Sequence, residues 1–398
     1  MSGRLANPLR DQVAVIGVGT TPYVRDGGTR SRGALVIDAC IAALNDAGLQ
    51  PGDIDGLCGG AAQASPQYVQ SGLGIPVLRW WSTPPMPMSL PILEAAHAVF
   101  AGACSTAVVY HSQFRGASVS ARPDQLDAVR RQPDPARFDY HWHDQYYQGS
   151  RIRTLAYAGY MRRYLFECDV QPEHFGRIAV NSRTHAQRNE HAAMRKPLTL
   201  KDYLRSPMVN DPMRLLDIDY AVDGGDAFVV TTRDRAESLG RPYALLHSAS
   251  HGSLGQPEVD RYPSVADTGQ VIAAAALWEK AALSRSDVDI VYAYDGFTVI
   301  AMKWLESFGF CRPGDAGRLI DESWDEDSNT LRLGGTVPVN THGGSLSEGA
   351  TQGAGHLREA VSQLRGTAGP RQVPGARTAL LGIGGLFYNS VALLLRAA

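Results

Sequence analysis

Residues 39–55 read ACIAALNDAGLQPGDID, and residues 273–289, which lie 234 positions later, read AAAALWEKAALSRSDVD. Each segment has the composition of an alanine-rich helix followed by an Asp-x-Asp turn, and each leads into a hydrophobic segment typical of a strand. At this register Ala39, Ala42, Ala47, Leu49, Asp53 and Asp55 align with Ala273, Ala276, Ala281, Leu283, Asp287 and Asp289. Equivalent turns in equivalent positions favour an internal duplication, with a chance match between alanine-rich helices as the alternative.

Strand-like and helix-like segments alternate around both copies of the repeat. Residues 13–18 (VAVIGV) and 105–111 (STAVVYH) predict buried strands, and residues 33–48 predict an amphipathic helix that ends at a glycine. The second half ends with predicted strands at 377–381 and 387–395. Such alternation is typical of layered α/β folds. Further helices are predicted at 89–101, 152–167 and 171–188.

The repeat divides the chain into two predicted halves, residues 1–250 and residues 251–398. The first half contains a long insertion, about 113–210, whose early part is dense in Arg, Asp and Tyr. Its aromatic content argues against disorder. A segment of this length inside a compact domain is typical of a lid, a partner surface or part of a substrate wall, and these alternatives stay open.

Composition excludes several classes of function. The 398 residues carry 38 Lys and Arg against 40 Asp and Glu, so the net charge of −2 argues against nucleic acid as a partner. No run of about 18 apolar residues and no secretory leader is visible, so we expect a cytoplasmic protein without a membrane span. The five cysteines are an odd number and form no CxxC pair, which argues against a disulfide framework or a zinc ribbon.

Three motifs carry a resemblance to a known family. Residues 339–349 (VNTHGGSLSEG) form a glycine-rich loop, residues 293–298 (AYDGFT) follow a predicted strand, and residues 381–385 (LGIGG) lie near the end of the chain. In this order they resemble the thiolase superfamily, in its lipid-transfer-protein branch. The resemblance implies an α/β thiolase-like fold with two duplicated αβαβα-layered halves, and a homodimer.

The residues that thiolases use for chemistry do not align with their counterparts here. The nucleophilic cysteine of thiolases lies at the start of a buried helix, and this place falls near Met86. Their activating histidine aligns with Ala350 and their second cysteine with Gly382, while Cys104 lies beyond the helix and is expected to be a core residue. We therefore do not expect covalent acyl transfer through cysteine.

Another branch, the aldolases that cleave steroid side chains, resembles the chain closely at residues 294–298, 340–344, 363–367 and 212–217. The resemblance implies retro-aldol cleavage of a bulky β-hydroxyacyl-CoA, whose coenzyme A belongs to the substrate, so that no separate cofactor is expected. It also implies a partner protein with an OB-fold and a zinc ribbon that helps to hold the acyl-CoA.

One departure from this branch keeps another class of function open. The aldolases place a catalytic tyrosine where this chain has Ala350. The alternative is a catalytically silent thiolase-like scaffold, or a lipid- or acyl-CoA-binding subunit of a heteromeric complex. An acyltransferase that uses a nucleophile of its partner is a third possibility.

Two residues are the candidate catalytic groups. Tyr294 follows a predicted strand at the position of the thiolase oxyanion-hole residue, and its phenol can donate a hydrogen bond or, with a lowered pKa, act as a base. The alternative is a tyrosine at a strand end that bonds to the backbone. His342 lies in the glycine loop and suits proton transfer, or it orients the loop.

Five further residues are candidates for binding the substrate or its oxyanion. By resemblance, Asp295 is more suited to fixing the loop than to chemistry, and Asn340 can donate to a carbonyl or bond within its own loop. His356 is expected to be solvated or to cap its helix. His141 and His143 alternate as metal ligands can, but no further ligands complete a set, so no metal site is expected. The five candidates are Asp295, Asn340, Gly343, Gly344 and Tyr388.

Overall fold

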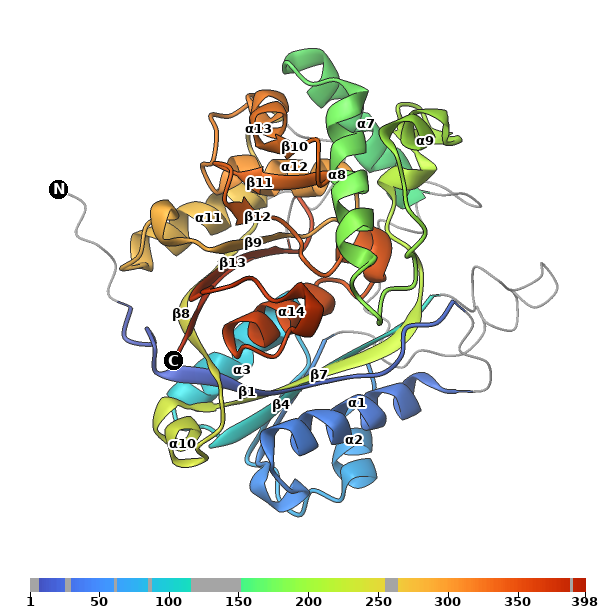
Figure 1. The fold of residues 1–398 in the computed structure, drawn as a ribbon. Helices are drawn as coiled ribbons and strands as arrows, with labels where there is room; N and C mark the ends of the chain where they lie inside the picture. The colour runs from blue at the N-terminus through green and yellow to red at the C-terminus, as the bar shows by residue number, and fades with distance from the viewer. Residues whose placement is uncertain are drawn as a thin grey trace.

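The structure is a computed structural model, and it describes residues 7–25, 30–60, 63–84, 88–115, 152–254, 264–386 and 389–398. One nine-stranded sheet runs through the molecule (Figure 1). Most of its strands were expected from short apolar segments, and they are buried along nearly their whole length. The strand order is β3 (Trp80–Ser82), β2 (Gly56–Gly59), β4 (Thr106–Phe114), β7 (Asp223–Thr232), β1 (Val13–Thr20), β8 (Ala244–Gly252), β14 (Ser390–Ala397), β13 (Thr378–Ile383) and β9 (Ile290–Ala293).

Helices α3 (Ser89–Phe100) and α14 (Ala354–Leu364) lie between the two parts of this sheet, which join where β1 meets β8 (Figure 1). Outside the first part lie α1 (Arg32–Ala47) and α2 (Pro66–Leu73). Outside the second part lie α11 (Gly269–Lys280) and α12 (Thr298–Ser307). Three hydrophobic clusters fill the spaces between these layers. The expected α/β layering is confirmed, with five layers in the order αβαβα.

The two copies of the repeat have the same local structure. Helix α1 ends at Gly48, which is left-handed with φ 70°, and short 3₁₀ turns follow both α1 and α11 at Pro51–Asp53 and Arg285–Asp287. The Asp55 carboxylate accepts hydrogen bonds from the N–H groups at the start of β4, at 2.8 and 2.9 Å. The Asp289 carboxylate does the same at the start of β13, at 2.7 and 2.9 Å. The shared Asp-x-Asp pattern therefore encodes one way of joining a helix to two strands.

These two aspartates give a first testable prediction. Asp55→Ala and Asp289→Ala each leave two strand N–H groups without their acceptor, and each should lower the free energy of unfolding by about 1–2 kcal/mol. Because the sites are in different parts of the sheet, the double variant should lose the sum within about 0.5 kcal/mol. Urea unfolding followed by circular dichroism measures this. Asp55→Asn keeps an acceptor oxygen and serves as the control, and a loss below about 0.5 kcal/mol in both alanine variants would contradict the role.

The described part of the insertion contains three helices, which pack on the C-terminal half. Helix α7 (Ile152–Glu167) has the predicted bounds, and α8 (Pro172–Ala186) lies within the predicted 171–188. Helix α8 packs against α9 (Leu200–Arg205), against α12 and against the turn Gly344–Glu348. Residues 116–151 lie outside the described residues, so the three alternatives for the insertion stay predictions. The division at residue 250 also stays a prediction.

The remaining elements are short. They are β5 (Met208–Asn210), β6 (Met213–Arg214), α10 (Arg233–Ser238), α13 (Ala316–Ser323), β10 (Trp324–Asp325), β11 (Thr330–Leu333) and β12 (Val337–Pro338). Within the described residues, no helix combines the length and the apolar character that a membrane span requires.

Candidate active site

The site forms where the end of β9 meets the glycine loop that leads into α14. Val291 of β9 is bridged in parallel to Val339, so the loop starts beside the strand that carries Tyr294 and Asp295. The loop continues through a π-helical turn, Gly344–Glu348, before α14 begins. The structure thus brings together every predicted site residue except Tyr388, which lies outside the described residues.

Asp295 holds the loop in place. Its carboxylate is fully buried and accepts hydrogen bonds from the Ser345 N–H at 2.6 Å and from the Ser182 hydroxyl at 3.0 Å. Gly344 lies directly against this carboxylate with φ 61°, and a side chain there would collide with it. The geometry therefore supports the loop-fixing role that the resemblance implies for Asp295.

Asn340 and Gly343 are also held by protein contacts. Asn340 has φ 54°, and its side chain accepts from the Ala293 N–H at 2.9 Å and donates to the Ala293 carbonyl at 2.8 Å. Gly343 has φ 105°, and an added Cβ would lie 2.6 Å from the Cβ of Ala186 on α8. The Asn340 side chain therefore bonds to the end of β9 rather than within its own loop, and contact of these residues with substrate stays a prediction.

Four aromatic rings follow one another through the site. The ring centroids of Tyr294 and His356 lie 5.7 Å apart, those of His356 and His342 4.5 Å, and those of His342 and Tyr292 5.7 Å. His356 is 1% exposed, and its Nε2 lies 3.1 Å from the Asp295 carboxylate. The expectation of a solvated or capping His356 is wrong, because α14 lies inside the molecule rather than on its surface.

Tyr294 is a neutral phenol at physiological pH. Burial raises the pKa of Tyr294 well above its usual value, Asp219 adds to this increase, and Arg115 only partly opposes it. Arg115 is paired with Asp219 at 3.1 Å. A phenol in this state donates a hydrogen bond and does not act as a base. Tyr294 is 9% exposed, whereas His342 is fully enclosed.

His342 is an uncharged imidazole in the folded protein. Burial lowers the pKa of His342 well below its usual value, and His356 and Arg358 add to the effect. Its backbone carbonyl accepts a hydrogen bond from the Asn189 side chain at 2.8 Å, which fixes the loop from the side of α8. The ring can therefore take part in proton transfer only as a neutral group.

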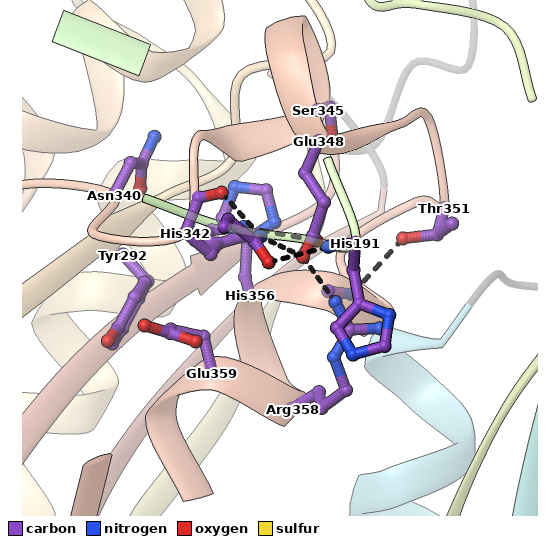
Figure 2. Close-up of polar contacts among 12 residues, drawn as sticks. His191, Tyr292, Asn340, His342, Ser345, Glu348, Thr351, His356, Arg358 and Glu359 are labelled. Carbon is purple, nitrogen blue, oxygen red and sulfur yellow. Dashed lines mark hydrogen bonds and ion pairs between the residues drawn. The ribbon is translucent and has the colours of Figure 1, made fainter. Parts of the chain in front are cut away.

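A buried network of charges below the loop was not predicted from the sequence. Arg358 of α14 donates to Asp226 of β7 at 2.7 Å and to the Tyr23 hydroxyl at 2.6 Å. It also donates to Glu348, a contact that Figure 2 shows. Asn189 donates to Glu348 at 2.7 Å. No local pattern reveals such a network, since its members come from four distant segments. The only sequence signal is a set of charged residues in a helix that must be buried.

None of the five cysteines has an activated thiol. Burial raises the pKa of Cys104 to about 12, that of Cys311 to about 12 and that of Cys168 to about 11. Burial also raises the pKa of the Cys40 and Cys58 thiols. A nucleophilic cysteine needs the opposite shift. Cys104 is buried, as expected of a core residue, while Met86 lies outside the described residues.

Metal ligands do not cluster in the part of the chain that the structure describes: no group of three or more His, Cys, Asp or Glu side chains there could hold an ion. His141 and His143 lie outside this part. The absence of a metal or of a separate cofactor therefore stays a prediction.

The buried histidines predict a loss of stability in acid. Burial lowers the pKa of His111 to about 3, against an ordinary value of 6.5, and that of His342 is lowered as well. Below about pH 6.5 the unfolded chain binds protons that the folded chain does not. The contribution of each histidine is therefore complete above this pH and falls by about 1.4 kcal/mol per pH unit below it.

The variant His111→Gln should remove one of these contributions. Urea unfolding at pH 7, 6 and 5 should show a shallower loss for this variant than for the wild type, by about 1.4 kcal/mol per unit below pH 6.5. The difference between the two proteins is the relevant measure, because burial raises the pKa of Asp217 to about 6, and this group acts in the opposite direction. Parallel pH profiles for the two proteins would contradict the prediction.

The fold and the site define a thiolase-like protein, and comparisons with known proteins agree. Residues 253–397 match the family described as thiolase C-terminal domain-like. The chain is 33% identical to the steroid side-chain-cleaving aldolase of Thermomonospora curvata over 376 residues, which cover 90% of this chain and 92% of that protein. It is 31% identical to the 17-hydroxy-3-oxo-4-pregnene-20-carboxyl-CoA lyase of Mycobacterium tuberculosis over 373 residues, covering 90% and 93%.

A solved structure supports the same family relationship. The Ltp2-ChsH2(DUF35) aldolase superposes with a TM-score of 0.85 at 30% identity, covering 98% of this chain and 99% of that chain. The chain belongs to the thiolase superfamily, and within it to the family of carbon–carbon lyases that includes these aldolases. The resemblance inferred from the three motifs is confirmed.

Proposed function

We propose that the protein cleaves a bulky β-hydroxyacyl-CoA of the steroid side-chain type by a retro-aldol reaction. The relationship to the aldolases over nine-tenths of the chain carries this proposal. The substrate named for the Mycobacterium tuberculosis relative is of this class, because its hydroxyl on carbon 17 is β to the thioester borne on carbon 20. The raised thiol pKa values of all five cysteines also favour a reaction without an acyl-cysteine intermediate.

The site residues have complementary roles in this proposal. Breaking the bond between the α and β carbons leaves a thioester enolate, which needs hydrogen-bond donors at its oxygen. Tyr294 supplies one, since its raised pKa keeps the phenol protonated. His342 takes part in proton transfer as a neutral ring, and Asp295 holds the loop that carries it. Ala350, which is buried, stands where the aldolases place a catalytic tyrosine. A side chain from another position therefore completes the site.

Two kinds of assembly belong to the proposal. An OB-fold partner with a zinc ribbon binds the coenzyme A portion of the substrate, and the name of the Ltp2-ChsH2(DUF35) aldolase, which joins two components, favours a heteromer. A second copy of the chain pairs through the end of the sheet, where β3 is the last strand in the order and Trp81 is exposed. The coenzyme A of the substrate is the only cofactor proposed, and the cytoplasm is the proposed location.

The test is turnover with a defined substrate. The chain is co-expressed with an OB-fold, zinc-ribbon protein of the proposed kind and given 17-hydroxy-3-oxo-4-pregnene-20-carboxyl-CoA, and also smaller β-hydroxyacyl-CoAs. We expect a steroid 17-ketone and propionyl-CoA in equal amounts. If no thioester is cleaved but a related active subunit loses activity without this chain, the protein is the scaffold or acyl-CoA-binding subunit instead. The buried, hydrogen-bonded site favours the enzyme, because a scaffold has no use for it.

A further inference from the structure

Four buried polar atoms without a hydrogen-bond partner gather in one segment of the glycine loop. They are Nδ1 and Nε2 of His342, Oγ of Ser345 and Oε2 of Glu348, and none has a partner among the residues that the structure describes. All three residues are at most 1% exposed. An unpartnered buried polar atom costs stability, and nearly all such atoms in native proteins are paired. In native proteins such atoms bond to protein groups, to ordered water or to a ligand, so a cluster of four in seven residues marks a place that binds a polar group.

The spacing of the two central atoms suits a single oxygen. Nε2 of His342 and Oε2 of Glu348 are 4.0 Å apart, which is too far for a direct hydrogen bond. For an oxygen placed about 2.8 Å from each atom, the angle between its two hydrogen bonds would be roughly 90°. A hydroxyl can use this arrangement, since it donates its hydrogen to the carboxylate and accepts one from the imidazole.

The carboxylate of Glu348 is fixed in the position that such a site needs. Its Oε1 accepts from Asn189 at 2.7 Å and from Arg358, which leaves Oε2 directed toward His342 (Figure 2). Gly355 on α14 lies against Oε2, and any larger residue there would collide with it. Arg358 is in turn held by Asp226 at 2.7 Å. Most of this network therefore serves to hold one carboxylate oxygen in place.

We propose that His342 and Glu348 bind the β-hydroxyl group of the substrate, with Glu348 as the base that removes its proton. This inference rests on the proposed function and deepens it. The hydroxyl proton moves to Oε2 of Glu348, and the electrons of the O–H bond form the new carbonyl. The bond between the α and β carbons breaks, its electrons form the thioester enolate, and the enolate takes up a proton from solvent at the α carbon, while Glu348 releases its proton to solvent. No oxidant or reductant is required.

The variant Glu348→Gln tests the proposal, because glutamine keeps an acceptor for Asn189 and Arg358 and removes the base. The wild-type complex should bind 17-hydroxy-3-oxo-4-pregnene-20-carboxyl-CoA roughly tenfold more tightly than its analogue without the 17-hydroxyl, since hydrogen bonds to charged groups are strong. In Glu348→Gln this preference should fall to within about threefold, and kcat should fall about 100-fold. Calorimetry gives the two dissociation constants, and single-turnover product formation gives the rate.

Glu359→Gln is the matched control. Glu359 is also a buried carboxylate near the loop, but its oxygens are occupied by Arg371, at 2.9 Å, and by Thr341, at 3.1 Å. This variant should keep the tenfold preference. A Glu348→Gln protein that retains the preference would overturn the site even if cleavage is observed. A wild-type protein that shows the preference but cleaves nothing would overturn the proposed function and leave the site standing.

Discussion

Replacing Arg358 by methionine is expected to lower the free energy of unfolding by about 3–5 kcal/mol. The guanidinium is nine-tenths buried and lies between Asp226 and Glu348, which are both buried. Methionine fills a similar volume but leaves two carboxylates in the interior without a cation. Removing one partner of a buried ion pair is among the most destabilising single changes, because the remaining charge has lost its solvation and its counter-ion.

Urea unfolding at pH 7 measures this loss, and a variant with three substitutions separates the effect of charge from the effect of packing. Adding Asp226→Asn and Glu348→Gln to Arg358→Met removes the uncompensated charges and should restore at least half of the lost stability. If Arg358→Met costs less than about 1 kcal/mol, the network does not stabilise the central layer. If the variant with three substitutions restores nothing, the loss comes from packing rather than from charge.

Replacing Tyr294 by phenylalanine is expected to lower kcat by about 10²–10³-fold with little change in the affinity for substrate. Removing one donor from an oxyanion site has an effect of this size, because the donor acts on charge that develops only in the transition state. Phenylalanine keeps the ring against His356, so the fold should be unchanged. Single-turnover measurements with the steroid thioester separate the chemical step from binding.

Tyr292→Phe is the matched control for this variant. Tyr292 lies two residues earlier, within β9, and is also buried, but its hydroxyl is paired with Thr341 at 2.9 Å. Its loss should change kcat less than about fivefold. Equal effects of the two variants would mean that Tyr294 contributes only through the structure of the strand end, which is the alternative that the sequence left open.

The fold was predictable because its signals are local. The alternation of apolar segments gave the layers, and the Asp-x-Asp pattern marked two equivalent helix-to-strand connections that Asp55 and Asp289 make in the same way. Gly48 ends α1 in the left-handed conformation that glycine favours. These features depend on a few neighbouring residues, and one sequence is sufficient to reveal them.

The chemistry of the site was only partly predictable. Tyr294, Asp295 and His342 were found because their motifs resemble those of a family. In the structure, Tyr294 and His342 belong to the four successive aromatic rings, and Asp295 bonds to the glycine loop. His356 and Glu348 were not, since their importance depends on α14 lying in the central layer and on partners such as Asp295 and Asn189 that are far away in sequence. Burial and the direction of a side chain are properties of the tertiary structure.

Cleavage of 17-hydroxy-3-oxo-4-pregnene-20-carboxyl-CoA in D₂O, without added coenzyme A, tests the central claim most directly. A retro-aldol reaction needs no free thiol and should yield the steroid 17-ketone together with propionyl-CoA that carries one deuterium at its α carbon, because solvent quenches the enolate. Mass spectrometry of the two products measures this. Loss of water to give an unsaturated steroid thioester, or hydrolysis to the free steroid acid and coenzyme A, with no ketone in either case, would contradict the account.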